Sequence, residues 1–579
     1  MSLKNKGRTR TRSVIFKVLS WAFGIPLALI AIAALACVWL HATADLGEPE
    51  FVPSQVPVVQ VNDSLRRWGS SSLRIDPDGL YEMRVCGGPF ERGEAIGKLG
   101  AELLYEQEKA FADKLFEMVP SSRYRAFLHY FITIFNRRLG ASVPLEYRQE
   151  IKAMSASCTH EFDEFGSPYE RQMQYHSAHD IGHVMQDYML VGCTSFAVWG
   201  RESADSSLLI ARNFDFYMGE EFAKNKLVLF EKPDSGYAYV SVTWPGMLGV
   251  VSGMNTEGLA VTINASKLEV PSSSATPISI LVKSILQYAS NIEEAETIAA
   301  SFKTFVCESI LVGSANDGRA MIIEKTPSAM DVYSTGLSSS DKMDSSLDEA
   351  VTRVICTNHY QSDRFRDDPV NVENIRVSDS GYRYRRVQQL LDSLGSIDYL
   401  KAAAVLRDIR GVDGEDVGYC NDLSINQMLA MHSVIFKPAE KKIWVSTSPW
   451  QFGKFVCFDL DEVFGDEGVL AGDAGFSDDE LSIPADKFLE TEAFRNVLKF
   501  KAMQQMLATA SKSRREVPAD SLSLFVSWNP SYYGTYVSVA SYLESLGKNA
   551  EADEYYRRAL TCPMKLSERQ HLESRLRGR

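Results

Sequence analysis

The chain has few cysteines, no excess of positive charge and no period in its glycines and prolines. Nine cysteines in 579 residues are too few for a disulfide-stapled scaffold. The net charge of -14 argues against a nucleic-acid binder, whose affinity comes from neutralising phosphates. The 37 glycines and 21 prolines follow no repeat, which excludes collagen-like and coiled-coil chains. With 45% hydrophobic and 23% charged residues, the composition is that of a globular protein of about two to four domains.

One long uncharged run lies near the N-terminus. Basic residues and no acidic residue precede it, and Val18–Leu40 then carries no charge. A helix of that length spans a bilayer core of about 30 Å. Residues 1–44 are therefore expected to form a cytoplasmic tail and a single-pass anchor, with the rest of the chain in the periplasm or otherwise outside the cytoplasm. The alternative is a signal peptide cleaved after Ala42-Thr43-Ala44.

The rest of the chain divides by composition and periodicity. Residues 45–79 are expected to be an extended linker, because their first part, 45–61, contains three spaced prolines. Residues 80–192 read as mainly helical. Residues 193–460 alternate short β-rich runs with helical ones and predict an α+β core. Residues 461–483 are acidic and glycine-rich, which is typical of a solvated linker.

Within the α+β core, alternating and helical patterns predict individual elements. Strands are expected at 194–199, 207–212, 226–230, 237–243, 259–264, 309–312, 320–324, 353–357, 433–436 and 442–446. Helices are expected at 278–290, 292–302, 384–394 and 398–407.

Residues 484–579 form a last helical segment with the spacing of one tetratricopeptide repeat. The matching positions are Tyr536, Val539, Ala540, Leu543, Gly547, Ala552, Tyr556 and Ala559. One such repeat cannot bury its own apolar face, so the segment is expected to dock on the main domain. It is also the candidate surface for a protein partner.

The first candidate for chemistry is Gly192-Cys193-Thr194-Ser195-Phe196. Here Cys193 opens a β-rich run, and Arg212 and Asp215 follow 19 and 22 residues later, at the end of the next expected strand. A hairpin would bring both beside the thiol. Arginine can stabilise a thiolate, and a carboxylate can orient an amine or a base. The pattern favours a cysteine nucleophile, with a buried structural cysteine as the alternative.

Further motifs follow in a fixed order. They are Gly253-Met254-Asn255-Thr256-Glu257-Gly258, Thr262-Ile263-Asn264-Ala265, Thr357-Asn358-His359-Tyr360, Tyr382-Arg383-Tyr384-Arg385-Arg386 and Met431-His432-Ser433-Val434-Ile435. With the Gly-Cys-Thr-Ser-Phe stretch, this set resembles the N-terminal nucleophile (Ntn) hydrolases. The nearer group is the acyl-coenzyme A:6-aminopenicillanic acid acyltransferase-like one, peptidase family C45. Choloylglycine hydrolases and penicillin V acylases are more distant. The resemblance covers about residues 80–460.

The resemblance implies a four-layer αββα sandwich that is made as an inactive precursor. Autocatalytic cleavage of the Gly192–Cys193 bond would leave Cys193 at a new N-terminus. Its freed α-amino group, with a reference pKa of about 7.7–8.0, would serve as the general base. The resemblance implies no cofactor and no metal ion.

By position, the resemblance also assigns the other site residues. Asp215 would bind the freed amine, and Arg212 would lie beside the sulfur, as in choloylglycine-type enzymes. Asn264 and Asn358 would form the oxyanion hole, one through its backbone N–H and the other through its side-chain amide. Arg383 matches a family arginine near the site, but Arg385 and Arg386 leave that register open.

The histidines allow two other interpretations of the chemistry. His176, His179 and His183 share a helical spacing and could bind a metal, or could form a polar helix face in the segment before Cys193. His359 could act as the base of a Cys/His hydrolase.

The expected function is an extracytoplasmic amidase that cleaves a linear, non-peptide C–N amide of a small acyl-amide substrate through a thioester on Cys193. The resemblance also allows acyl transfer from coenzyme A, although that metabolite is cytoplasmic. A membrane-tethered interaction protein with an inactive hydrolase domain is the alternative from another class. The sequence fixes neither the acyl nor the amine part of the substrate.

Overall fold

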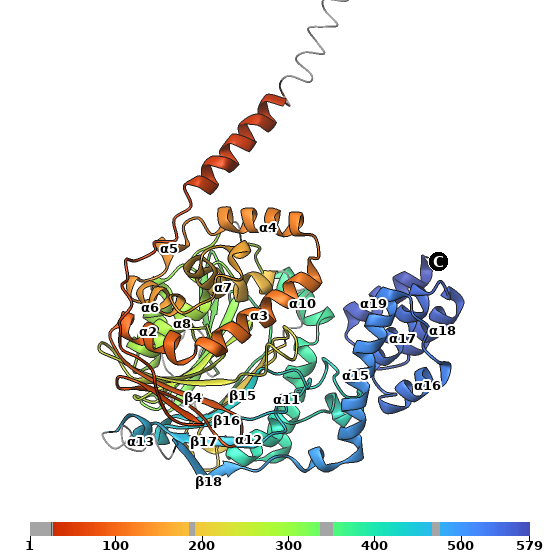
Figure 1. Cartoon of the computed structure of the whole chain (residues 1–579). Coiled ribbons are helices and arrows are strands. Elements are labelled where there is room, and N and C mark those ends of the chain that lie inside the picture. Colours follow the sequence, from red (N-terminus) through yellow and green to blue (C-terminus); the bar gives the residue numbers. More distant parts are fainter. Residues whose placement is uncertain are drawn as a thin grey trace, which may run out of the picture.

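The computed structural model describes residues 25, 27–184, 192–271, 273–335, 351–465 and 475–578, with the backbone alone for 178–184. Two β-sheets form the centre of the protein (Figure 1). The larger sheet has eleven strands. Their order is β1 (Val59–Asn62), β2 (Leu65–Trp68), β3 (Ser71–Ile75), β4 (Tyr81–Gly87), β7 (Leu227–Pro233), β8 (Tyr239–Thr243), β9 (Ser252–Asn255), β10 (Leu259–Ala265), β11 (Glu308–Ser314), β12 (Arg319–Lys325) and β13 (Met330–Tyr333). Strands β4 and β7 pair in parallel, and the other neighbours are antiparallel.

The smaller sheet has seven antiparallel strands, and it carries Cys193 at one strand end. Their order is β14 (Arg353–Cys356), β5 (Thr194–Val198), β6 (Leu209–Phe214), β15 (His432–Lys437), β16 (Lys442–Ser446), β17 (Phe455–Asp459) and β18 (Ser477–Ile483).

The two sheets face each other across an apolar core. Its members alternate along strands of both sheets, such as Val228 and Phe230 on β7 and Val434 and Phe436 on β15. That alternation is what a strand with one face against a second sheet requires.

Helices cover the two outer faces. On the larger sheet these are α2 (Pro89–Leu99), α3 (Ala101–Met118), α6 (Leu145–Ser155), α7 (Pro168–Val184), α8 (Ile278–Tyr288) and α9 (Ile292–Ser301). On the smaller sheet they are α11 (Ser380–Leu394) and α12 (Tyr399–Leu406). Further helices at the periphery are α4 (Ser122–Phe135), α5 (Leu139–Ser142), α10 (Pro369–Val377) and α13 (Leu460–Phe464). The mixed α+β fold expected from the sequence is confirmed, and its layers run helix, sheet, sheet, helix.

The predicted linker 45–79 is wrong in its second half, because residues 59–75 form three strands. Leu65, Trp68 and Leu73 are buried on these strands, and Trp68 and Leu73 pack in one apolar cluster with side chains of α2. Through β4, these strands join the middle of the larger sheet. The segment before Cys193 is therefore part of the fold, and the described residues of 80–192 are mainly helical as expected, apart from strand β4.

A buried group of four charges ties this segment to the core. Lys283 Nζ on α8 lies 2.9 Å from Glu150 on α6 and 3.2 Å from Glu231 on β7. Arg92 on α2 lies 3.3 Å from Glu150 and 3.4 Å from Glu231. All four side chains are at most 1% exposed. Each charge is therefore stabilised by the opposite charges of the group and not by water.

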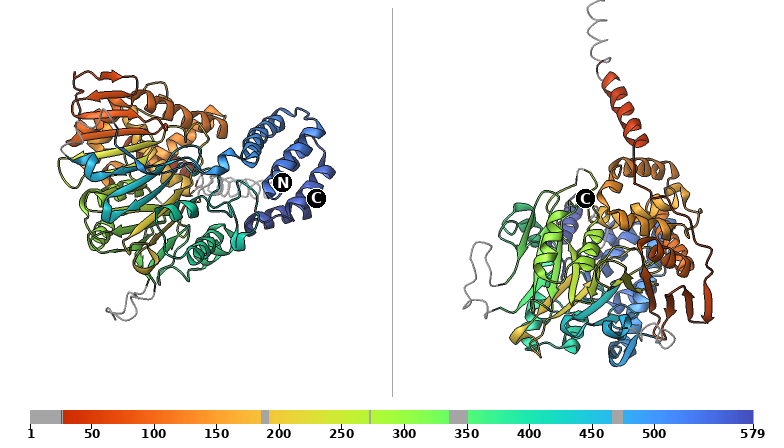
Figure 2. Two further views of the ribbon diagram at one scale, coloured as in Figure 1. Left: turned by 90° about the horizontal axis from the view of Figure 1, so that it is seen from below. Right: turned by 90° about the vertical axis from the view of Figure 1, so that its left-hand side faces the viewer.

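Five helices form the C-terminal unit, confirming that this region is helical. They are α15 (Glu492–Ser513), α16 (Ala519–Trp528), α17 (Tyr533–Ser545), α18 (Asn549–Ala559) and α19 (Leu566–Arg577). The unit has an apolar core of its own and lies to one side of the sandwich (Figures 1 and 2). The tetratricopeptide interpretation stays a prediction.

The predicted acidic linker 461–483 contains an edge strand. Strand β18 pairs with β17, and its side chains are exposed or half-buried except that of Ile483, which explains why its polar sequence reads as a linker. Residues 466–474 of that linker lie outside the described part.

Residues 27–42 form a helix that projects from the sandwich (Figure 1). Its exposed apolar side chains include Leu27, Leu29, Ile30, Ile32, Leu35, Val38 and Trp39. Within the described part of the chain, no helix has both the length and the apolar content that crossing a bilayer requires. Residues 18–24 and 26 of the predicted span lie outside the described part.

Candidate active site

Cys193 lies directly before β5, in the interior of the protein, with 1% of its surface exposed. Strand β5 pairs antiparallel with β6, and Ser195 is opposite Arg212 in that register. The hairpin predicted from the spacing is therefore present, and it brings the β6 residues beside the thiol. Asp215 follows the end of β6, and its carbonyl oxygen accepts a hydrogen bond from the Gly192 N–H at 3.1 Å.

Arg212 is held rigidly against the sulfur. Its Nη2 lies 3.6 Å from the Cys193 Sγ, and the same nitrogen donates to the carbonyl oxygen of Ile263. Its Nη1 donates to Val251 O at 2.9 Å and to Ser252 Oγ. The guanidinium is completely buried and stacks over the Phe214 ring at 4.4 Å, so its charge has one fixed position.

Burial opposes ionisation of the thiol. It raises the pKa of Cys193 to about 11, while the Arg212 charge acts in the lowering direction. In the intact chain the sulfur is therefore a protonated thiol at neutral pH. A base close to the sulfur is needed to make it a nucleophile.

Asp215 is a completely buried carboxyl group without a hydrogen-bond partner for either oxygen among the described residues. Burial raises the pKa of Asp215 to about 8, although the Arg383 and Arg212 charges act in the lowering direction. An unpartnered buried carboxyl costs free energy, which a cation placed beside it would recover. The α-ammonium group of a new N-terminus at Cys193 would be such a cation.

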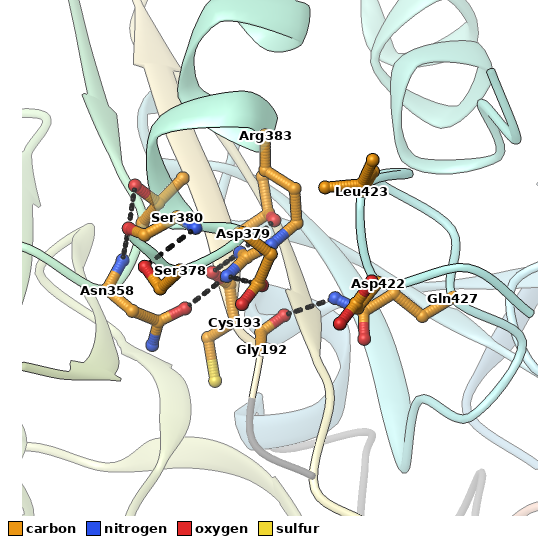
Figure 3. A network of polar contacts seen from close by, with 12 residues as sticks. Gly192, Cys193, Asn358, Ser378, Asp379, Ser380, Arg383, Asp422, Leu423 and Gln427 are labelled. Atoms are coloured by element: carbon orange, nitrogen blue, oxygen red, sulfur yellow. Dashed lines mark hydrogen bonds and ion pairs between the residues drawn. The ribbon is translucent and has the colours of Figure 1, made fainter. Parts of the chain in front are cut away.

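Arg383, on α11, also lies beside Cys193 (Figure 3). Its Nη1 donates to the Cys193 carbonyl oxygen and, at 2.9 Å, to Thr194 Oγ1. Its Nη2 donates to Asn358 Oδ1 at 2.6 Å, and Nε donates to Asp379 at 2.8 Å.

Among the three candidate arginines, Arg383 is the one that contacts the site. Arg385 instead lies over the Tyr382 ring, and Arg386 pairs with Asp408 at 2.8 Å. The helical register thus places Arg383 toward Cys193 and the other two elsewhere.

The two asparagines of the predicted oxyanion hole differ in their contacts. Asn358 Nδ2 donates to Ala265 O at 2.8 Å, which leaves its second amide hydrogen for another acceptor. Asn264 has its side chain engaged at both ends, since it accepts from Ser195 Oγ at 3.0 Å and donates to Cys356 O at 2.8 Å. Asn264 therefore braces β5 and β14 against β10.

The described histidines have structural partners. His359 Nδ1 contacts Ser380 Oγ at 2.8 Å and Thr357 Oγ1 at 3.1 Å, and burial lowers its pKa to about 4. His176 is also buried, donates to Gln172 O and accepts from Leu248 N–H. The side chains of His179 and His183 lie outside the described part, and no metal-binding group occurs among the residues described.

Four further residues complete the surroundings, of which the sequence analysis named only His432, as part of a motif. Ser252 Oγ links Arg212 to His432 Nε2, at 2.9 Å from that nitrogen. Burial and the Arg212 charge hold the pKa of His432 well below its ordinary value, so it is neutral. Asp379 fixes Arg383, and Gln427 reaches the Gly192 carbonyl. The sequence signal for Asp379 was its i, i+4 spacing from Arg383.

Fold and site together define an α+β sandwich protein with a candidate cysteine nucleophile at a strand start. A family model, acyl-coenzyme A:6-aminopenicillanic acid acyl-transferase, matches residues 201–448. The resemblance predicted from the motifs is thereby confirmed for this part of the chain. The matched part holds Arg212, Asp215, Asn264, Asn358 and Arg383 and begins after Cys193.

Relatives are distant. An uncharacterized protein of Archaeoglobus fulgidus is 24% identical over 442 residues, which are 68% of this chain and 70% of that protein. An N-acylethanolamine-hydrolyzing acid amidase ortholog of Caenorhabditis elegans matches 43% of this chain and 93% of its own, with 18% identity and a TM-score of 0.30.

Two further solved structures match a similar share of the chain. A conjugated bile acid hydrolase from Clostridium perfringens matches 47% of this chain and 93% of its own, with 13% identity and a TM-score of 0.29. Penicillin V acylase from Agrobacterium tumefaciens matches 44% and 83%, with 13% identity and a TM-score of 0.28.

Proposed function

We propose that the protein is an amidohydrolase whose nucleophile is Cys193, activated by cleavage of its own Gly192–Cys193 bond, and that it cleaves linear, non-peptide C–N amides. The observation that carries this proposal is the unpartnered carboxyl of Asp215. It is buried beside the Gly192–Cys193 junction, and the Arg212 guanidinium lies at the sulfur. A freed α-ammonium at Cys193 would satisfy Asp215, and no other described group does so.

In the processed enzyme, the α-amine takes the thiol proton as the sulfur attacks the substrate carbonyl. Arg212 stabilises the thiolate as it forms, because its charge is fixed 3.6 Å away by three other acceptors. The amine then gives the proton to the leaving nitrogen, and a thioester on Cys193 remains. Water, deprotonated by the same amine, hydrolyses the thioester and restores the thiol.

The negative oxygen of each tetrahedral intermediate needs donors that are already in place. The Asn358 amide supplies one, and Arg383 holds it by its Oδ1 while anchoring the Cys193 carbonyl. The Asn264 side chain is engaged with Ser195 and Cys356, so any donor from Asn264 would be its backbone N–H.

Acyl transfer differs from hydrolysis only in the group that attacks the thioester. An amine in place of water gives an acyltransferase, and the family match is compatible with both. We favour hydrolysis because the anchor would place the site away from the cytoplasmic pool of coenzyme A. An inactive, membrane-tethered interaction protein is disfavoured by the intact set of buried charges around Cys193.

We further propose that the N-terminal segment is a membrane anchor with its basic end in the cytoplasm. The support is the uncharged run Val18–Leu40, its basic flank and the exposed apolar side chains of residues 27–42. An apolar helix that projects from the body without a covering surface needs an apolar environment.

Mass spectrometry of the purified protein tests the central proposal. Wild type should consist of two chains, one of which begins at Cys193, and Cys193→Ala should stay whole. An uncleaved wild type with full amidase activity would overturn the mechanism, since its base would not exist.

A further inference from the structure

We propose that Gln427 stabilises the oxyanion of the self-cleavage step, and that the C-terminal helical unit holds Gln427 in place for it. This inference rests on the proposed processing at Gly192–Cys193. It assigns a role to a residue outside the substrate oxyanion hole and to a unit outside the sandwich.

Gln427 contacts the carbonyl group of the bond to be cut. Its Nε2 donates to Gly192 O at 3.4 Å, and the side chain is 3% exposed (Figure 3). A Cβ at position 192 would lie 2.5 Å from the same nitrogen, so this close approach requires glycine there. The glycine of the junction therefore admits the amide to the scissile carbonyl.

The chemistry of the cleavage puts negative charge on that oxygen. The Cys193 sulfur attacks the Gly192 carbonyl carbon, a C–S bond forms and the carbonyl oxygen becomes an oxyanion. When the C–N bond breaks, the thiol proton ends on the Cys193 nitrogen, and a thioester to Gly192 remains. Water then adds its hydroxyl to that carbon and its proton to the sulfur, which leaves a Gly192 carboxyl group and the free thiol.

The hydrogen-bond donors around Cys193 differ between self-cleavage of the chain and cleavage of the substrate. Arg383 holds the carbonyl of Cys193 itself and the side chain of Asn358. The Gly192 carbonyl oxygen instead accepts a hydrogen bond from the Gln427 side chain. A donor at this oxygen stabilises the cleavage intermediate, and its partner becomes a carboxylate once the chain is cut.

Gln427 belongs to a segment, residues 416–428, that the C-terminal unit holds at several points. Tyr419 and Asn529 exchange two hydrogen bonds, at 3.0 and 2.9 Å. Asn421 Nδ2 donates to the Pro563 carbonyl at 3.3 Å. These contacts join the 416–428 segment to the turn before α17 and to the turn before α19.

Two lysines of the unit complete the attachment. Lys565, directly before α19, pairs with Asp422 at 2.8 Å, and both side chains are at most 20% exposed. Lys501 on α15 donates to the Met428 carbonyl at 3.0 Å, directly after Gln427. The segment that carries Gln427 is thus fixed on both sides by side chains of the helical unit.

The test measures the rate at which freshly made full-length chain is converted to the chain starting at Cys193. Gln427→Met keeps the length of the side chain without a donor and should slow cleavage by about tenfold, less than the loss for a well-aligned donor because the bond is long. Gln505→Met, an exposed glutamine of α15, is the matched control and should cleave at the wild-type rate. Amide turnover per cleaved molecule should fall less than the cleavage rate.

The positioning role has its own pair of variants. Lys565→Met should slow cleavage, and Lys565→Arg should restore it, since arginine keeps the charge that pairs with Asp422. Thermal midpoints of uncleaved material, in a Cys193→Ala background, show whether a loss of fold accounts for the rate.

The outcomes separate the two proposals. If wild type is never cleaved, the proposed function fails and this inference fails with it. If wild type is cleaved and Gln427→Met is cleaved equally fast, the inference alone is wrong. If Lys565→Met slows cleavage and Lys565→Arg does so equally, the helical unit does not act through this ion pair, and its part of the inference is overturned.

Discussion

The guanidinium of Arg212 lies 3.6 Å from the sulfur of Cys193, with both groups completely enclosed by protein. Because Val251, Ser252 and Ile263 hold the same guanidinium, it cannot swing away when the sulfur is neutral. The charge is in place before a thiolate exists, so little reorganisation is needed as the thiolate forms.

Replacing Arg212 should make the thiol harder to ionise. Arg212→Gln removes the charge that acts against burial, so the pKa of Cys193 should move further above its ordinary value. At a fixed pH near 8, alkylation of Cys193 by iodoacetamide should be slower than in wild type. An unchanged rate at matched folding, checked by circular dichroism, would show that Arg212 does not act on the sulfur.

Asn358→Ala should lower turnover by about 10²–10³-fold, because one donor to the developing oxyanion is lost. The Michaelis constant should change much less, since the donor acts chiefly in the transition state. The assay needs material confirmed as cleaved, so that a processing defect is not taken for a catalytic one. Wild-type turnover in cleaved Asn358→Ala would refute this oxyanion assignment.

Asp215 should make the uncleaved protein less stable as the pH rises. Its folded pKa is raised to about 8 from an ordinary value near 4, so between these values the unfolded chain has lost a proton that the folded chain keeps. Stability therefore falls with rising pH across this window. In a Cys193→Ala background, Asp215→Asn should raise the thermal midpoint at pH 8 relative to its parent.

The same comparison at pH 4 is the control, because Asp215 is then mostly protonated in the folded state and much less ionised in the unfolded one. The gain from Asp215→Asn should be smaller there than at pH 8. A gain that is equal at both pH values would mean that Asp215 ionises normally in the folded protein.

A reporter enzyme that works only outside the cytoplasm should be active when fused after Leu460. The basic flank before Val18 predicts this orientation. Deleting residues 1–44 should abolish the reporter signal and release the protein from membranes. Recovery of full-length protein wholly in the soluble cytoplasmic fraction would contradict both an anchor and a signal peptide.

The sequence predicted many of the interior strands because their apolar residues are buried, but it missed the interior strands β4, β9 and β17. The expected strand 259–264 is β10, Leu259–Ala265, and 442–446 is β16. Two edge strands were missed: β1 is four residues long and exposed throughout, and β18 is polar and exposed or half-buried except at Ile483, so neither has a buried apolar face. Backbone hydrogen bonds to a neighbouring strand define both of them: β1 pairs with β2, the next strand in the sequence, and β18 pairs with β17.

The site residues that belong to a sequence motif could be predicted from the sequence. The residues that only the tertiary fold brings to the site could not. The motifs named Arg383, Arg385 and Arg386 together, and only the direction of α11 selects Arg383. Gln427 lies 235 residues from Gly192 and belongs to no motif. Contacts of that kind follow from the tertiary fold alone.

The parallel pairing of β4 with β7 crosses the expected cleavage point. The buried group of four charges also joins the two parts of the chain. Arg92 and Glu150 precede the expected cleavage point in the sequence, and Glu231 and Lys283 follow it. A gene that begins at Cys193 would encode a chain with β7 as a bare apolar edge, which is prone to aggregate. The two halves should instead behave as a split protein, soluble when co-expressed from two genes and not when either is made alone.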